Sequence, residues 1–512
     1  MAGNSLALAR TDCPFDNIQP DTGVTMLHAP ESPLHGLWDT WLFPAEDGYH
    51  LYYLKRDLRD MFAKTIAHAT SPDLVHWTAV RDALHANSST AWDSGWFMTG
   101  MVVRHHDGRY YMFYGSMVDQ VQRIGVAISE DLYHWQKHPY PVMEARAPFY
   151  ETDPRRSPNH EVAWRDPCVI YDAETACYYA FICARVPNGS YSGGGCIAVC
   201  RSKDLLAWET LPPAFISDEY VCMEVPDVFK LNGRYYLMFS TARWFDSYYT
   251  TADPNCVNGT FYLVSDNLLH GWQRPADNIV IASRESRLDS YVGRSVAHPK
   301  DGTRLFYQHM VRRKHPNDIA SFGAVKQLST APNGALRVVA RRDVDPFTQL
   351  LASYTPYSLG GAWRAEGERL CAEAESAALY LPYQAEAALI EVRLTFGSTG
   401  GIGGLIVGYG SAAAQGLCIA LNRPAAQLEV GLCGAEFGTL RRFPPIQARR
   451  TDLSAEAYTL RVLVRDHYVE IYLDDVLMIA LSWAHLPYGG AGFYVEGTAV
   501  AFGEARFAAL NF

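Results

Sequence analysis

Short hydrophobic runs rich in tyrosine, each preceded by a turn, recur five times in the first part of the chain. The runs are GYHLYYL from Gly48, GRYYMFY from Gly108, CYYAFI from Cys177, GRYYLMF from Gly233 and TRLFYQH from Thr303. Because tyrosine and its aromatic and β-branched neighbours favour strands, each run predicts a β-strand. Regular recurrence of one strand type predicts a repeat architecture.

A second pattern, a polar turn closed by a tryptophan, follows four of these five runs. It reads SPDLVHW from Ser71, SEDLYHW from Ser129, SKDLLAW from Ser202 and SDNLLHGW from Ser265. Another short apolar run precedes each turn, so one unit holds about four short strands. Radial repetition of four-stranded sheets defines a β-propeller. We therefore predict an all-β chain whose residues 1–340 form a five-bladed propeller.

The repeats stop after the fifth unit, and the pattern changes to longer alternating runs. Segments such as ALIEVRLTF, LCIALNR, YTLRVLVRD and YVEIYLDD alternate apolar and polar positions, as the strands of a two-sheet sandwich do. Residues 341–363 contain Asp-Pro, Thr-Pro and Gly-Gly and read as a linker. We predict a C-terminal β-sandwich over residues 364–512, packed against the propeller because the linker is short.

Composition narrows the classes of partner. The chain has 512 residues, 48% of them hydrophobic and 19% charged, with a formal net charge of −11. A nucleic-acid groove needs a basic face, so we expect no nucleic-acid partner. No apolar run reaches the length of a membrane span and no signal peptide is recognisable, so we expect no membrane partner and a cytoplasmic location. The 11 cysteines are predicted to be reduced core residues, with a zinc site or disulfides as the alternative.

Three acidic residues occupy equivalent positions in different repeats. Asp39, Asp166 and Glu224 lie at nearly the same distance before the tyrosine-rich strands of the first, third and fourth units. In a propeller this segment is the innermost strand, so equivalent positions face one axial pocket. Isolated acids in apolar strands are disfavoured and costly when buried. The matching positions therefore predict a cluster of three carboxylates around the axis.

Such a cluster suits glycoside hydrolysis. Neighbouring carboxylates raise one another's pKa, so one can remain protonated while another is ionised. The reaction needs that difference, because an acid protonates the leaving oxygen while a carboxylate acts at the anomeric carbon. Tryptophans beside these segments predict walls for a sugar ring. They are Trp38, Trp41, Trp92, Trp96 and Trp164.

The acidic segments resemble the signature blocks of glycoside hydrolase families 32 and 68, which comprise invertases, levanases, inulinases and fructosyltransferases. The blocks are WDTW from Trp38, WRDP from Trp164 and MEVPD from Met223. WDTW is closer to the fructosyltransferase block Trp-Asp-Ser-Trp than to the invertase block Asn-Asp-Pro-Asn-Gly, and Val225 stands where invertases have cysteine. Family 32 carries a C-terminal sandwich and family 68 does not. The domain layout therefore favours a family 32-like enzyme with a diverged first block.

The resemblance implies a role for each acidic residue. Asp39 matches the nucleophile, Asp166 the transition-state stabiliser and Glu224 the general acid/base. With the tryptophans, the expected substrate-binding residues are Trp38, Trp41, Trp92, Asp93, Thr99, Trp164 and Arg165. No metal and no other cofactor is implied. We expect a retaining hydrolase of oligo- or polysaccharides, with transfer to a second sugar open. Its expected substrates are β-fructofuranosides such as sucrose, levan, inulin or a fructose dianhydride.

Two other interpretations remain open. Arabinofuranosidases and xylosidases of the family 43 type are also five-bladed propellers with two Asp and one Glu in the active site. They hydrolyse the glycosidic bond with inversion of the anomeric configuration. His309 resembles their metal-associated axial histidine, although its context favours a hydrogen-bonded core histidine. The other interpretation is a non-catalytic sugar-binding propeller, because a fold does not determine a function. The sandwich is predicted to be structural, or the surface of a homo-oligomer.

Overall fold

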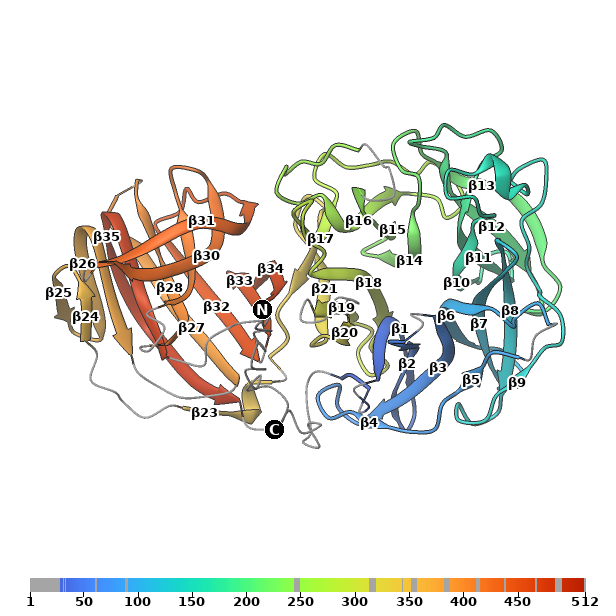
Figure 1. Cartoon of the computed structure of the whole chain (residues 1–512), viewed down its shortest axis with the longest axis horizontal. Helices are drawn as coiled ribbons and strands as arrows, with labels where there is room; N and C mark the ends of the chain where they lie inside the picture. Colours follow the sequence, from blue (N-terminus) through green and yellow to red (C-terminus); the bar gives the residue numbers. More distant parts are fainter. Residues whose placement is uncertain are drawn as a thin grey trace, which may run out of the picture.

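The computed structural model describes residues 28–30, 32, 34–59, 62–87, 91–243, 249–312, 319–342, 344–350, 357–381, 387–398, 400–410, 415–436, 439–465, 467–483 and 490–510. Two β domains lie side by side in Figure 1, with the N-terminal domain in blue to yellow and the C-terminal domain in orange to red. Apart from the single 3-10 turns Pro154–Arg156 and Asp345–Phe347, the elements in these ranges are strands. The predicted all-β class, with a propeller followed by a sandwich, is confirmed.

The strand pairings of the N-terminal domain form five antiparallel groups, which we number as blades I to V. Blade I contains β1 (His35–Ala45), β2 (Gly48–Asp57), β3 (Ala63–Ser71), β4 (Thr78–Ala79) and β5 (Leu84–His85). Blade II contains β6 (Trp96–Arg104), β7 (Tyr110–Val118), β8 (Val121–Ser129) and β9 (Gln136–Lys137). Blade III contains β10 (Trp164–Asp172), β11 (Cys177–Arg185), β12 (Gly195–Ser202) and β13 (Glu209–Ile216). Blade IV contains β14 (Glu224–Leu231), β15 (Arg234–Thr241), β16 (Asn258–Ser265) and β17 (Ile279–Ser283). Blade V contains β18 (Ser290–Ala297), β19 (Arg304–Arg312), β20 (Ile319–Phe322), β21 (Lys326–Thr330) and β22 (Leu336–Val339).

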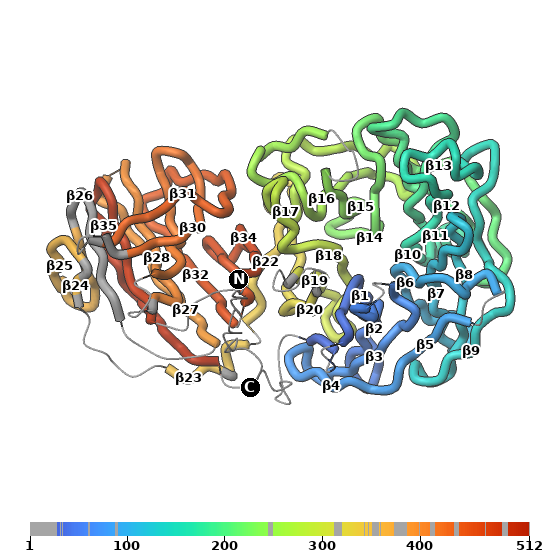
Figure 2. Tube along the Cα trace, viewed as in Figure 1, coloured from blue at the N-terminus to red at the C-terminus, as the bar shows by residue number. Residues whose placement is uncertain are grey.

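The inner strands of these five blades close a ring. Strand β1 contacts β6 and β18, β6 contacts β10, β10 contacts β14, and β14 contacts β18. Blade V is also joined to blade I by a strand pairing between Leu37 of β1 and Ala320 of β20. Figure 2 shows these two strands, far apart in sequence, next to each other. The carboxylate-bearing strands β1, β10 and β14 thus face a common axis.

The polar turn that repeats in the sequence has the same structure in blades I, II and III. In blade I, Ser71 Oγ accepts a hydrogen bond from the Leu74 N–H at 2.8 Å, and Asp73 Oδ1 accepts one from the His76 N–H at 2.8 Å. These side-chain acceptors allow the leucine to adopt a left-handed φ of 70°. The same two bonds recur at Ser129 and Asp131 and at Ser202 and Asp204.

The C-terminal domain is a sandwich whose two sheets share one long strand. Its strands are β23 (Thr348–Leu350), β24 (Tyr357–Gly360), β25 (Trp363–Glu366), β26 (Arg369–Leu381), β27 (Ala387–Phe396), β28 (Ile402–Gly410), β29 (Gln415–Asn422), β30 (Gln427–Glu436), β31 (Thr439–Arg450), β32 (Ala457–Arg465), β33 (Tyr468–Leu473), β34 (Val476–Ser482) and β35 (Gly490–Leu510). Strand β35 pairs with β23, β26, β27 and β28. Alternating apolar residues of β27, β29 and β32 fill the space between the sheets, as their patterns predict.

The segment predicted as a linker carries structure of its own. Within residues 341–363, β23 pairs with β35 and β24 pairs with β26. The Pro and Gly dipeptides that suggested a linker therefore separate short edge strands of the sandwich. The sandwich begins earlier in the chain than the alternating pattern indicated.

The two domains share a polar and partly buried interface. Val339 of β22 pairs with Val476 of β34, so the outer strand of blade V continues into the sandwich. Lys326 of β21 forms a buried ion pair with Glu470 of β33, and Tyr472 donates a hydrogen bond to Glu470 Oε2 at 2.6 Å. Lys326 also donates to the Ala324 carbonyl at 2.5 Å. The cysteines within the described ranges are all free and buried, and no helix there is long and apolar enough to span a membrane.

The buried pair predicts a coupled effect on stability. Glu470→Gln leaves the Lys326 ammonium buried without its counter-charge and should lower the free energy of unfolding by about 3–5 kcal/mol. Lys326→Met in the same chain removes the unpaired charge, so the double variant should recover most of that loss. Urea denaturation of the wild type, both single variants and the double variant measures this. Additive losses in the double variant would contradict it.

Candidate active site

All five inner strands break their register at the same level of the propeller. Each break is a β-bulge, a feature that re-aims side chains and is frequent near active sites. The bulges lie between Trp38 and Thr40, Met98 and Gly100, Arg165 and Cys168, Glu224 and Asp227, and Tyr291 and Arg294. Asp39 and Asp166 lie within their bulges and have positive φ values of 20° and 60°. Positive φ is strained for residues other than glycine, and such strain concentrates at functional sites.

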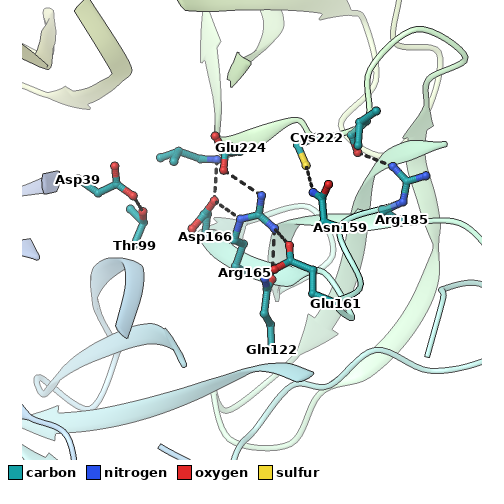
Figure 3. A network of polar contacts seen from close by, with 12 residues as sticks. Asp39, Thr99, Gln122, Asn159, Glu161, Arg165, Asp166, Arg185, Cys222 and Glu224 are labelled. Carbon is teal, nitrogen blue, oxygen red and sulfur yellow. Dashed lines mark hydrogen bonds and ion pairs between the residues drawn. The ribbon is translucent and has the colours of Figure 1, made fainter. Parts of the chain in front are cut away.

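The bulges bring side chains from four blades to one place. Thr99 of β6 donates a hydrogen bond to Asp39 Oδ2. Asp166 Oδ2 accepts a hydrogen bond from the Val225 N–H at 3.1 Å, which ties blade III to blade IV directly beside Glu224. Figure 3 shows Asp39 and Thr99 on one side and Asp166 and Glu224 on the other. The predicted convergence of the three carboxylates is therefore present in the structure.

Both oxygens of Glu224 are held by donors from neighbouring blades. Arg165 Nη2 donates to Oε1 at 2.9 Å, and Tyr291 Oη donates to Oε2 at 2.6 Å. Arg165 is itself buried and fixed by Gln122 Oε1 at 3.3 Å and Glu161 Oε1 at 3.4 Å (Figure 3). Because each contact fixes a different atom, the carboxylate plane of Glu224 is oriented before a substrate arrives.

Burial and mutual repulsion perturb the ionisation of both aspartates. The pKa of Asp39 is raised to about 6, mainly by loss of hydration and also by the charge on Glu224, while the Thr99 hydrogen bond opposes the rise. Burial also raises the pKa of Asp166 to about 7, with Arg165 opposing and the charges of Asp39 and Glu224 adding to the rise. Perturbed carboxylates at one site are a physical signature of a functional centre.

An aromatic stack borders Asp39. Trp38, which is half-buried, lies against the imidazole of His309 with ring centroids 4.8 Å apart. The Arg56 guanidinium lies over the Trp38 ring at 4.2 Å from its centroid. His309 was predicted to be a hydrogen-bonded core residue, and this is wrong for the described residues, because neither ring nitrogen has a hydrogen-bond partner among them.

Only part of the predicted substrate-binding set reaches the carboxylates. Trp38, Thr99 and Arg165 do, through the contacts given above. Trp41 and Trp164 are fully buried instead, Trp41 beside Tyr52 and Trp164 against Tyr150. Trp41 pairs with Tyr52 past the bulge and packs in the hydrophobic cluster between blades I and II.

The two remaining residues of that set stay within blade II. Asp93 is buried and forms an ion pair with Lys137 Nζ at 2.7 Å, with Asn87 and Tyr114 as further donors. Every oxygen of Asp93 is thereby occupied. The Trp92 ring stacks on Tyr114 with centroids 5.7 Å apart. We therefore correct the prediction for Trp41, Trp164 and Asp93, which are buried and whose described contacts support the blades, whereas substrate contact by the partly buried Trp92 stays a prediction.

Several residues of the site were not predicted to lie beside the carboxylates. Tyr291 and His309 come from blade V, which has no acidic residue at the equivalent position, and the sequence indicated His309 only through its resemblance to a metal-associated histidine. Gln122 and Glu161 hold Arg165 from outside the inner strands. The one usable signal for Tyr291 was its position in the inner strand of the fifth repeat. Among the described residues, no group of three His, Cys, Asp or Glu side chains could hold a metal ion.

Comparison with known proteins agrees with this geometry. Residues 41–289 match the model of the glycosyl hydrolases family 32 N-terminal domain. The sucrose-6-phosphate hydrolase of Lactobacillus gasseri has a similar structure, with a TM-score of 0.69 at 16% identity over 96% of this chain and 94% of that one. Fructan 1-exohydrolase IIa of Cichorium intybus has a TM-score of 0.69 at 14% identity, over 95% of this chain and 97% of that one. The exo-inulinase of Aspergillus awamori has a TM-score of 0.67 at 13% identity, over 97% of this chain and 99% of that one. No curated protein matches the chain by sequence.

These likenesses extend over both domains, and at such low identity they establish the shared fold. The family model covers the blades that carry Asp166 and Glu224, and it ends next to the inner strand of blade V. The chain is a glycoside hydrolase family 32-like protein. In enzyme class it is a glycoside hydrolase.

The raised pKa of Asp166 predicts how stability depends on pH. An aspartate with a pKa of about 7 in the folded state and an ordinary pKa near 4 when unfolded stabilises the fold at low pH. That stabilisation is lost as the pH rises through 7. Asp166→Asn keeps the shape without the charge, so it should raise the thermal midpoint at pH 8 and change it much less at pH 4.5.

A matched control is Asp266→Asn, because Asp266 has a side chain that is 95% exposed. Differential scanning calorimetry at the two pH values compares both variants with the wild type. The explanation fails if Asp166→Asn shifts the midpoint equally at pH 4.5 and pH 8.

Proposed function

We propose that the protein is a retaining glycoside hydrolase of β-fructofuranosides such as sucrose, levan, inulin or a fructose dianhydride. The observation that carries the proposal is the meeting of Asp39, Asp166 and Glu224 at bulges of three inner strands. Relatives of the same fold support the substrate class. The Cichorium intybus exohydrolase has been solved in complex with 1-kestose, and the Schwanniomyces occidentalis fructofuranosidase with fructosylnystose.

Asp39 is the proposed nucleophile. The Thr99 hydrogen bond occupies Oδ2, and Oδ1 has no hydrogen bond among the described residues. In the first step Oδ1 bonds to the anomeric carbon while the glycosidic bond breaks, and the leaving oxygen takes a proton from Glu224. In the second step Glu224 removes a proton from water, the water oxygen bonds to the anomeric carbon, and Asp39 leaves as a carboxylate. A second sugar in place of water gives a transfer product.

Asp166 and Arg165 have the proposed task of holding the sugar and the acid/base. Asp166 is buried beside Glu224, so a carboxylate there accepts hydrogen bonds from ring hydroxyls, as a transition-state stabiliser requires. Arg165 orients Glu224 through its 2.9 Å hydrogen bond, and it also lies 3.5 Å from Asp166. A single guanidinium therefore couples the two carboxylates that contact different parts of the sugar.

Trp38 favours a second substrate class. Invertase-type blocks have asparagine at this position, and here a half-buried indole lies directly before the nucleophile. An indole offers an apolar face in place of an amide donor. An arabinofuranoside, which lacks the additional hydroxymethyl group at the anomeric carbon, is therefore the second candidate. The inverting, family 43-type reaction and a non-catalytic sugar-binding propeller are the competing functions that the experiments below distinguish.

The carboxylate roles predict large losses of turnover. Asp39→Asn and Glu224→Gln preserve shape and remove the nucleophile and the proton donor, so each should lower kcat by ~10²–10⁴-fold or more. Asp266→Asn, the same chemical change at an exposed site, should leave kcat unchanged. Steady-state rates on the best substrate measure this. Wild-type turnover in both site variants refutes the assignment, and sugar binding without cleavage in the wild type indicates the binding propeller.

Stereochemistry separates the two enzymatic candidates. A panel of sucrose, inulin, levan and aryl arabinofuranosides identifies the substrate, and the reaction is then run with methanol as acceptor. A covalent glycosyl-enzyme passes the sugar to methanol, so a retaining enzyme yields a methyl glycoside of the substrate's own anomeric configuration. Proton NMR identifies this product, which does not mutarotate. A first-formed inverted sugar with no methyl glycoside excludes Asp39 as the nucleophile.

A further inference from the structure

His309 is a buried imidazole for which the fold supplies no hydrogen bond. It lies in β19 of blade V with an exposed fraction of 0%, and neither Nδ1 nor Nε2 has a hydrogen-bond partner among the described residues. A buried polar group without a partner destabilises the fold, so each one calls for an explanation, of which a functional role is one. The packing of the blade does not explain this residue, because an aromatic hydrocarbon side chain would fill the space without that cost.

One ring nitrogen of His309 faces the proposed nucleophile. Nδ1 lies 3.8 Å from Asp39 Oδ1, the oxygen that Thr99 does not bond. The face of the same ring lies against Trp38, the residue directly before Asp39. His309 therefore lies beside both the carboxylate of Asp39 and the side chain of the residue before it, Trp38. A displacement of the carboxylate by less than 1 Å brings Nδ1 within hydrogen-bond distance of Oδ1.

The imidazole is neutral in this environment. Its pKa is lowered to about 3, mainly by burial and also by the positive charge of Arg56. A neutral imidazole has one N–H donor and one acceptor nitrogen. A carboxylate oxygen opposite Nδ1 selects the tautomer with the proton on Nδ1, because the other tautomer would place two lone pairs against each other.

We propose that His309 is a positioning residue for Asp39, whose Nδ1–H holds the attacking oxygen in line with the anomeric carbon. This rests on the proposed function. Thr99 fixes one carboxylate oxygen and His309 restrains the other, so the carboxylate cannot rotate away from the sugar. No proton is transferred, and the bond is closed when the substrate displaces the carboxylate toward His309. Loss of this restraint lowers kcat and leaves substrate binding largely unchanged.

Three substitutions at His309 distinguish the contribution of a ring nitrogen from that of the packing of the ring. His309→Phe keeps a ring face for Trp38 and removes both nitrogens. His309→Asn places an amide nitrogen close to the position of Nδ1, and His309→Gln places one close to Nε2. We expect His309→Phe to lower kcat by ~10–10²-fold with little change in KM, the effect of a misplaced reacting group. His309→Asn should recover most of that loss and His309→Gln should not.

The pH profile gives a readout that packing alone would not change. The acid limb of kcat/KM reports the coupled ionisation of Asp39 and Asp166, and Asp166 is the same in every variant of this series. Loss of the N–H donor to Asp39 should therefore move that limb to higher pH in His309→Phe and back in His309→Asn. Charged or hydrogen-bonding groups face Asp39 from each surrounding element, and all stay constant in this series. They are Arg56 of β2, Thr99 of β6, Asp166 of β10, Glu224 of β14 and Arg294 of β18. Wild-type kcat and acid limb in His309→Phe, or equal rates in the Asn and Gln variants, overturn the proposal.

A spectroscopic measurement keeps this test separate from the proposed function. In protein labelled with [15N]histidine, the His309 signals are those missing from His309→Asn. We expect Nδ1 to carry the proton at pH 8 and its shift to change in Asp39→Asn. An unprotonated Nδ1 overturns the proposal whether or not a furanoside is cleaved. A protonated Nδ1 coupled to Asp39 in a protein that cleaves no furanoside rejects the hydrolase function but supports the contact.

Discussion

Burial of three like-charged carboxylates beside one axis is the constraint on which the rest of the site depends. Lost hydration and mutual repulsion raise the pKa of both Asp39 and Asp166, so the fold must supply compensating donors. Those donors come from different blades, Thr99 from blade II, Arg165 from blade III and Tyr291 from blade V. The ring of five blades is thus also an electrostatic arrangement. It holds each acid in a different environment, which acid–base chemistry at one pH requires.

Blade V has a distinct part in this arrangement. It carries no acid at the level of the bulges and contributes a phenol, an imidazole and a guanidinium instead. Arg294 reaches across the axis to the Gly100 carbonyl at 2.7 Å, next to the residue that bonds Asp39. The sandwich contacts blade V through Lys326 and the pairing of β22 with β34, and it also contacts blade IV, where Gln447 Oε1 accepts a hydrogen bond from the Arg284 N–H at 3.0 Å. The C-terminal domain therefore supports the blade that orients the carboxylates, at a distance from the chemistry.

The sequence predicts the blades and the carboxylates well because both follow from repetition. Tyr-rich strands at matching intervals predict the five groups of strands, and equivalent positions in the repeats predict that Asp39, Asp166 and Glu224 meet. The tryptophans were predicted less well, because closeness to a carboxylate in sequence does not show which side chain the blade-to-blade packing buries. Trp41 is buried in the cluster between blades I and II, whereas Trp38 is half-buried and reaches the site. Tyr291 was missed, and His309 was noted only for its resemblance to a metal-associated histidine, because a lone polar residue in an apolar strand gives no indication of its partner.

The pairing of Leu37 with Ala320 has a consequence for the order of events during synthesis. The strand that closes the ring is made almost last within the propeller, whereas its partner leaves the ribosome early. Blades II, III and IV are contiguous hairpins and can form as they emerge, but β1 has no neighbour on its open edge until blade V is complete. Contacts so distant in sequence carry a large loop-closure entropy and slow the final step. Through most of translation the nucleophile-bearing strand is therefore an exposed edge, and a nascent chain of this fold is most open to aggregation at its first blade.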